Sequence, residues 1–177
     1  MGQSLLNNSD YWLDPQIFAI WNILVGERMK GGKSAFTRNW VWNRLADGSK
    51  NHSPRALLQL FDTAKQREIT EHPKNAYPKT LIRPSALTKS LEKVSKEVLS
   101  ALIQEEFIEL QPLVNELQKL GYSPFKADDI TELDKELKLA LEVGLLERYD
   151  ESPYNVQRYK VPDIYRLGIG MTRKGQA

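Results

Sequence analysis

The chain has 177 residues, a formal net charge of +2, 41% hydrophobic and 27% charged residues, and no cysteine. This length allows one sizeable domain or two small ones, and the composition is typical of a globular protein. The absence of cysteine excludes disulfide bonds, zinc–cysteine sites and thiol catalysis. No apolar stretch is long enough to span a bilayer and no signal peptide is visible, so we expect a cytoplasmic protein without membrane contact.

Charge is distributed unevenly along the chain. Residues 1–83 hold 12 Lys/Arg against 7 Asp/Glu, residues 84–152 hold 8 against 15, and residues 153–177 hold 5 against 1. A basic head, an acidic middle and a basic tail indicate segments that contact one another or different partners. Solvated helix faces that differ only in their exposed charges explain the pattern equally well, and the sequence leaves both explanations open.

Two short helices are expected in the first 48 residues. Asp14 as N-cap followed by Pro15 predicts a helix that Gly26 ends. Thr37 as N-cap and Gly48 as a terminating glycine predict the second helix. This part also holds all four tryptophans, which we expect in the core or at an interface: Trp12, Trp21, Trp40 and Trp42.

A third helix and a subdomain boundary follow. Ser53 before Pro54 is a strong helix start, because the serine oxygen can accept a free N–H and proline has no N–H that needs a partner there. The expected apolar stripe of this helix is Leu57, Leu58, Phe61 and Ala64. Three prolines then exclude a continuous helix, and we place the boundary between two subdomains, 1–83 and 84–177, in that segment: Pro73, Pro78 and Pro84.

Four more helices are predicted beyond the boundary. Ser85 and Ser95 are expected N-caps of two consecutive helices, and Gly121 ends a third. Asp129, with a glutamate three residues later, has capping-box spacing and predicts a fourth helix that Gly144 ends.

Two strand-like runs follow the last of these helices. The stretches LLERYD and QRYKVPD flank the turn-forming residues ESPYN and predict a β-hairpin. Two helices, then a helix followed by a two-stranded wing, is the layout of a winged helix. The predicted fold is therefore mainly α, with a helical lid-like subdomain (1–83) followed by a winged-helix subdomain (84–177), that is, a helix-turn-helix with a β-hairpin wing.

A winged helix makes DNA binding an obvious hypothesis, because the third helix of the motif often enters a major groove. Residues 128–142 argue against it, since they hold six acids and only two lysines, Lys135 and Lys138. Cations in the wing and tail leave contact with a nucleic-acid backbone or another partner open: Arg158, Lys160, Arg166, Arg173 and Lys174. We therefore favour a winged helix that binds protein, or another part of its own chain.

The sequence offers little for catalysis. The two histidines, His52 and His72, lie in polar, loop-like surroundings and lack metal-ligand spacing. Asp128 and Asp129 have the position of helix-capping residues rather than of a catalytic pair. We expect no catalytic residue, no metal and no cofactor bound by this chain alone.

The stretch GERMKGGKS, residues 26–34, ends in Gly-Lys-Ser, the tail of a phosphate-binding loop. Such a loop needs a glycine five residues before the second glycine, Gly32, and that position holds Glu27. Gly26 lies one residue too far back. We expect a connecting loop between two helices, and the enzyme alternative depends on nucleotide binding through Lys33.

Four stretches of the chain resemble the segment after the nucleotide-binding core of bacterial P-loop ATPases of the AAA/STAND kind. They are FAIWNILVGERMKGGKSAFTRNWVWNRLADG, SPRALLQLFDTAKQRE, ALEVGLLERY and RYKVPDIYRLGIGM. The resemblance covers roughly residues 12–172, and its best features are Ser-Pro-Arg at 53–55 and Val-Pro-Asp-Ile-Tyr-Arg at 161–166. It implies that Arg55 is a sensor-like arginine that reaches the terminal phosphates of a nucleotide. The alternative is a surface arginine with an exposed head.

The chain departs from that family where activity is concerned. It has no Walker A lysine in frame and no apolar strand ending in paired acids for magnesium, so ATP concerns only a parent ATPase. We expect a non-catalytic regulatory or interaction module that contacts a partner protein or an ATPase core. The rival from another class is a DNA-binding regulator that uses the basic wing and tail.

Overall fold

The computed structural model describes residues 14–30, 32–149 and 157–174. As predicted, this part of the chain is mainly helical, with a small amount of β-sheet. Its α-helices are α1 (Asp14–Val25), α2 (Thr37–Leu45), α3 (Pro54–Glu71), α4 (Pro84–Ala101), α5 (Gln111–Leu120), α6 (Asp134–Glu142) and α7 (Asp163–Ile169). Its strands are β1 (Tyr122–Ser123), β2 (Phe125–Lys126), β3 (Glu147–Arg148), β4 (Arg158–Lys160) and β5 (Thr172–Arg173).

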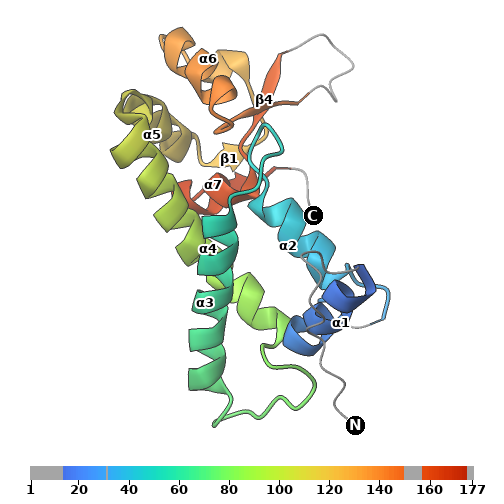
Figure 1. The fold of residues 1–177 in the computed structure, drawn as a ribbon. Coiled ribbons are helices and arrows are strands. Elements are labelled where there is room, and N and C mark those ends of the chain that lie inside the picture. The colour runs from blue at the N-terminus through green and yellow to red at the C-terminus, as the bar shows by residue number, and fades with distance from the viewer. Residues whose placement is uncertain (1–13, 31, 150–156, 175–177) are drawn as a thin grey trace.

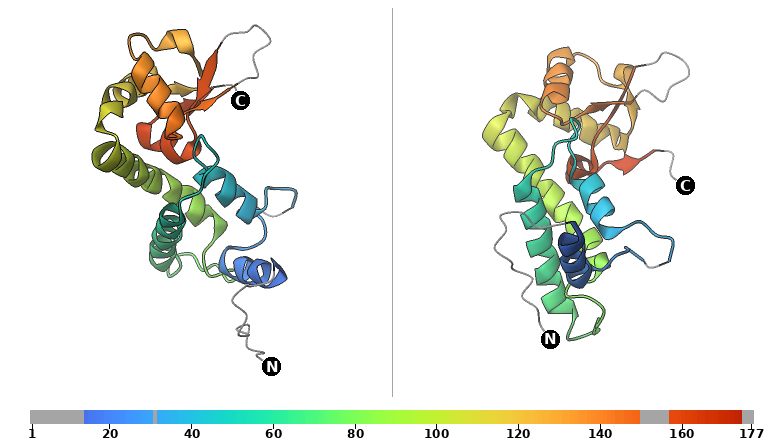
Figure 2. Two further views of the ribbon diagram at one scale, coloured as in Figure 1. Left: turned by 45° about the horizontal axis from the view of Figure 1, so that its top comes forward. Right: turned by 45° about the vertical axis from the view of Figure 1, so that its right-hand side comes forward.

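The long helices α3 and α4 pack against each other, and α4 also packs along α7. Helix α1 lies at one end of the molecule and α5, α6 and the three-stranded sheet lie at the other, with α2 between α1 and α7 (Figures 1 and 2). The buried apolar side chains form one cluster that runs from α1 through α3 and α4 to α7. The division into 1–83 and 84–177 stays a prediction.

Local signals located the first helices well. Helix α1 has the expected bounds, and Gly26 follows it with φ +79°, a conformation that favours glycine. Ser53 caps α3 as predicted, because its Oγ accepts the N–H of Ala56 at 3.4 Å. The expected cap Thr37 is wrong, since Phe36 occupies the N-cap position of α2 and the buried Thr37 hydroxyl instead donates to the carbonyl of Gly26.

The apolar faces differ in detail from the prediction. Leu58 of α3 is 70% exposed, whereas Leu60, which the predicted stripe omitted, is fully buried. The tryptophans divide in the same way, because Trp21 and Trp40 pack against the core and Trp42 is 62% exposed. Trp12 lies outside the described residues.

The two helices predicted after the boundary are one continuous helix, α4, which is followed by a π-helical turn at Leu102–Glu106. Ser95 is therefore not an N-cap. Its buried hydroxyl donates to the carbonyl of Ile164 at 2.6 Å and accepts the N–H of Gly168 at 2.7 Å. The Ser95 side chain therefore holds α7 against α4. In the sequence it resembled a helix N-cap, whereas its hydrogen-bond partners are distant along the chain.

The last predicted helix begins five residues later than its expected cap. Helix α6 starts at Asp134, and Asp129 belongs to a 3₁₀ turn, where its carboxylate accepts the N–H of Lys126 at 2.9 Å. Two terminating glycines are confirmed, since Gly121 and Gly144 have φ values of +73° and +78°, whereas α2 ends at Leu45, before the predicted Gly48. Because α6 is short, it carries three of the six acids that argued against DNA binding: Asp134, Glu136 and Glu142.

The predicted hairpin is confirmed as the antiparallel pair β3–β4, and β2 pairs with the other edge of β4. The expected turn residues 151–155 lie outside the described part. A second small sheet joins β1 to β5 in parallel. Nowhere in the described ranges is there a helix with the length and apolar character needed to cross a membrane.

Candidate functional site

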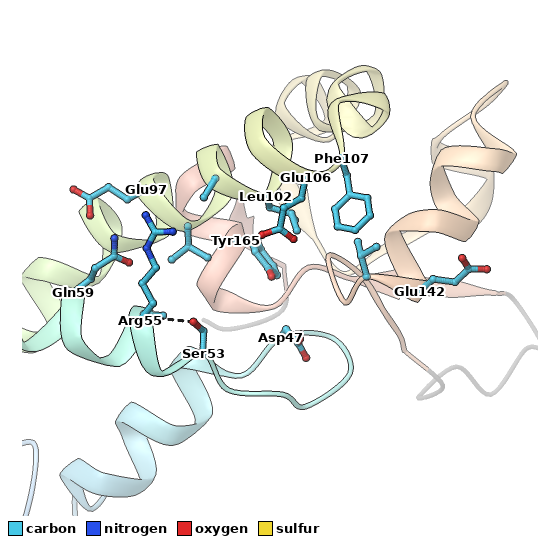
Figure 3. Close-up of a pocket in the computed structure, with 14 residues that line it drawn as sticks. Asp47, Ser53, Arg55, Gln59, Glu97, Leu102, Glu106, Phe107, Glu142 and Tyr165 are labelled. Atoms are coloured by element: carbon cyan, nitrogen blue, oxygen red, sulfur yellow. Dashed lines mark hydrogen bonds between the residues drawn. The ribbon is translucent and has the colours of Figure 1, made fainter.

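Arg55, the residue that the family resemblance singled out, lines a cavity of about 490 Å³. It is the second residue of α3, and its side chain extends toward α4 (Figure 3). The walls come from α3, α4, the π-helical turn and the end of α6, and the loop before α3 contributes Asp47. That loop is fastened to the α6–β3 turn, because the N–H of Gly48 donates to the carbonyl of Gly144 at 2.7 Å. Distant parts of the chain therefore meet at this cavity.

Acidic side chains dominate the cavity. Arg55 is the one cation among its lining residues, and it is accompanied by four carboxylates, Asp47, Glu97, Glu106 and Glu142. A concave surface lined by one sign of charge attracts ligands of the opposite sign. The terminal phosphates of a nucleotide would therefore be repelled here, which weakens the sensor role that the resemblance implies for Arg55.

Tyr165 of α7 lines the same cavity and was not recognised from the sequence. It is 7% exposed and lies beside Glu106 (Figure 3). Burial raises the pKa of Tyr165 to about 12, and the carboxylates of Asp47 and Glu106 add to the rise. The phenol thus stays protonated at neutral pH. It gives the cavity a polar group that can donate or accept a hydrogen bond.

The cations predicted for partner contact are distributed over two regions. Lys135 and Lys138 are exposed on α6. Arg158 and Lys160 lie on one face of β4, because alternate residues of a strand point to the same side. Lys160 and Arg166 line a common cavity of about 320 Å³, in which Arg173 and Lys174 also take part. The structure brings these last four together and leaves the α6 lysines outside that cavity.

The stretch 26–34 is a connection between α1 and α2, as predicted. Arg28 and Phe36 form a β-bridge across it, and the Arg28 Nη1 donates to the carbonyl of Ser34 at 2.7 Å. The N–H of Lys30 donates to Ser34 Oγ at 2.9 Å. These contacts close the loop on itself. Nucleotide binding through Lys33 stays an untested alternative.

The two histidines occupy separate places. His52 stacks on Trp42, with ring centroids 3.5 Å apart, and its Nε2 lies 3.0 Å from the carbonyl oxygen of the same tryptophan. His72 Nδ1 lies 3.3 Å from the carboxylate of Glu68. Within the described residues, no group of three or more His, Cys, Asp or Glu side chains is arranged to hold a metal ion.

Comparison of the chain with family models, with curated proteins and with solved structures finds no match. The resemblance to AAA/STAND ATPases therefore stays a prediction from the quoted motifs.

Proposed function

We propose that this chain is a non-catalytic interaction module whose acidic cavity, the one lined by Arg55, receives a cationic side chain of a partner protein or of another domain of a parent protein. The observation that supports the proposal is the set of four carboxylates around that cavity. Two unit charges 4 Å apart interact by about 1 kcal/mol in water and by about 4 kcal/mol near a protein surface. An arginine or lysine that enters the cavity gains from the carboxylates that it approaches; Glu97 and Glu142 lie at opposite ends of the cavity, with Glu106 between them (Figure 3).

The tyrosine and the arginine of the cavity fit the same role. Tyr165, protonated at neutral pH, offers a hydrogen-bond acceptor to an entering guanidinium or ammonium group. Arg55 stands at the start of α3, where its charge limits how many cations enter the cavity, so that one arginine or lysine of a partner is expected to enter at a time. If the chain is the C-terminal part of a P-loop ATPase, the ATPase core is the candidate source of that side chain.

We further propose that the subdomain predicted at residues 84–177 contains a winged-helix unit, which begins at α5 and ends at the hairpin strands. The order α5, β2, 3₁₀ turn, α6, β3, β4 supports this assignment, as does the antiparallel sheet β2–β4–β3. The end of α6 and the turn before β3 contribute to the acidic cavity. In this proposal the unit contacts its partner protein through the end of α6 that lines the acidic cavity. Regulation then consists of binding and release of the partner at that cavity.

The test uses fluorescence anisotropy with a fluorescein-labelled hexa-arginine peptide as the probe. The variant Glu106→Gln/Glu142→Gln removes two cavity carboxylates, and Glu109→Gln/Glu132→Gln is the control with the same change in charge at exposed positions outside the cavity. We expect the cavity variant to weaken peptide binding roughly 30-fold, because two lost carboxylates at about 1 kcal/mol each amount to about 2 kcal/mol. The control is expected to bind like wild type.

Two results contradict the proposal. One is equal loss of peptide binding in both double variants, which reduces the effect to net charge. The other is ATP binding that Arg55→Ala abolishes, since the cavity would then be the nucleotide-sensing site that the resemblance implies.

A further inference from the structure

A second cavity, of about 320 Å³, lies at the base of the hairpin, between β4, α7 and β5. Every charged side chain that lines it is a cation: Lys160, Arg166, Arg173 and Lys174. Tyr149 and Ser123 add two polar groups to its walls. No lining residue is shared with the acidic cavity, so the two sites can be tested separately.

Two carboxylates behind this wall, the buried Asp163 and the partly buried Glu147, hold the cations in place. The Arg166 Nε donates to Asp163 at 2.9 Å, and its Nη1 donates to the carbonyl of Met171 at 2.6 Å. Arg173 also binds Asp163, which is 7% exposed, and the Lys160 ammonium lies 2.6 Å from Glu147. Side chains fixed in this way lose little further freedom when a ligand binds, which favours affinity.

The carboxylates are too few to neutralise the cations around them. Asp163 contacts three guanidinium groups, those of Arg44, Arg166 and Arg173. Glu147 contacts two ammonium groups, those of Lys50 and Lys160. Lys174 is a further cation on the wall, with its ammonium 4.0 Å from the ring centroid of Tyr122. Five cations therefore contact these two carboxylates, and Lys174 adds a sixth positive charge to the wall of the cavity.

The pKa values of two arginines are lowered, as expected where positive charges lie close together. Burial lowers the pKa of Arg44, and the neighbouring charges of Arg173 and Arg166 lower it further. Burial and the charge of Arg173 likewise lower the pKa of Arg166. An anion in the cavity relieves this mutual repulsion, because it brings negative charge to groups that already repel one another.

We infer that this cavity binds a phosphate group through Lys160, Arg166, Arg173 and Lys174. Guanidinium forks and ammonium groups are the side chains that bind phosphate best, the former by bidentate hydrogen bonds and the latter as compact charges. A neighbouring groove of about 480 Å³ shares Lys160 and Arg173, but three carboxylates also line it, so the purely cationic lining ends at the cavity: Asp47, Glu147 and Asp163. A phosphate of a nucleic-acid strand and a free phosphate ion share the chemistry that fits this cavity.

The test separates these two sources. Inorganic phosphate is titrated by calorimetry, and labelled single-stranded and duplex DNA are titrated by anisotropy over a range of salt concentrations. The variant Lys160→Gln/Lys174→Gln leaves the arginines around Asp163 intact, and Lys79→Gln/Lys119→Gln is the control with the same charge change at exposed lysines elsewhere. Circular dichroism confirms that both variants are folded.

We expect the cavity variant to bind phosphate at least about tenfold more weakly than wild type, and the control to bind like wild type. If DNA binds too, the slope of log K against log salt is expected to fall by roughly 2 in the cavity variant alone. Dependence of DNA binding on these lysines assigns the site to a strand, and dependence of phosphate alone assigns it to a small anion; either result supports the inference. Absence of binding to every probe overturns it, and so does equal weakening in the two double variants.

Discussion

The ion pair between Glu68 of α3 and Arg83, just before α4, leads to a quantitative prediction about acid stability. Both side chains are nearly buried, with exposures of 5% and 6%. The Arg83 Nε and Nη2 donate to the two carboxylate oxygens at 2.8 and 2.9 Å, and the Arg83 backbone N–H donates to one of them at 3.1 Å. These bonds fasten the end of α3 to the start of α4.

The guanidinium hydrogen bonds of Arg83 lower the pKa of Glu68 from 4.5 to about 2, against the opposing effect of burial. Because the folded pKa lies below the unfolded one, the charged pair stabilises the fold fully above pH 4.5, and this stabilisation is lost as pH falls toward 2. At about 1.36 kcal/mol per pKa unit, the shift corresponds to about 3 kcal/mol. Roughly 2 kcal/mol of that is lost by pH 3.

Urea unfolding between pH 7 and pH 3 measures this loss. Glu68→Gln is expected to be about 3 kcal/mol less stable than wild type at pH 7 and to approach wild type as the pH falls. Glu109→Gln, which removes an exposed carboxylate, is expected to follow the wild-type pH profile. Parallel pH profiles for wild type and Glu68→Gln would refute the reasoning, because the acid sensitivity would then arise from other groups.

Two further predictions concern the contacts of α7. Ser95→Ala is expected to destabilise the fold by roughly 1–3 kcal/mol, because the partly buried N–H of Gly168 loses its acceptor and the carbonyl of Ile164 loses its donor. Thermal unfolding beside the exposed control Ser100→Ala measures this, and equal stability of the two variants would contradict the assigned role. Asp163→Asn is expected to lower the free energy of unfolding in urea by roughly 3–5 kcal/mol, because three guanidinium groups lose the carboxylate that they share. If an anion occupies the cationic cavity, inorganic phosphate is expected to restore part of that stability.

Local chemistry made much of the helical framework predictable. Ser53 before Pro54 and the glycines at 26, 121 and 144 act through their immediate neighbours, so their sequence context was sufficient. Ser95 misled because a serine that precedes a helical pattern resembles a cap, whereas its real partners are about 70 residues away on α7. Thr37 misled for the same reason, since its hydroxyl bonds to the chain that leaves α1.

The two cavities likewise differ in how far the sequence could predict them. The cations of the second cavity lie within 15 residues of one another, and the sequence already identified them as a basic wing and tail. The acidic cavity collects its carboxylates from positions between 47 and 142, so no local pattern could reveal it. The Ser-Pro-Arg motif at 53–55 singled out Arg55. The carboxylates that line the cavity with Arg55, and that oppose phosphate binding there, come from segments distant in the sequence.

The most direct test of the central claim is an NMR titration of the ¹⁵N-labelled protein with the hexa-arginine peptide. The account predicts amide shift changes concentrated around Asp47, Glu106 and Glu142, the acids that line the first cavity, and their absence in Glu106→Gln/Glu142→Gln. Shift changes confined to other surfaces, or unchanged in that variant, would contradict the claim that the acidic cavity is the partner-binding site.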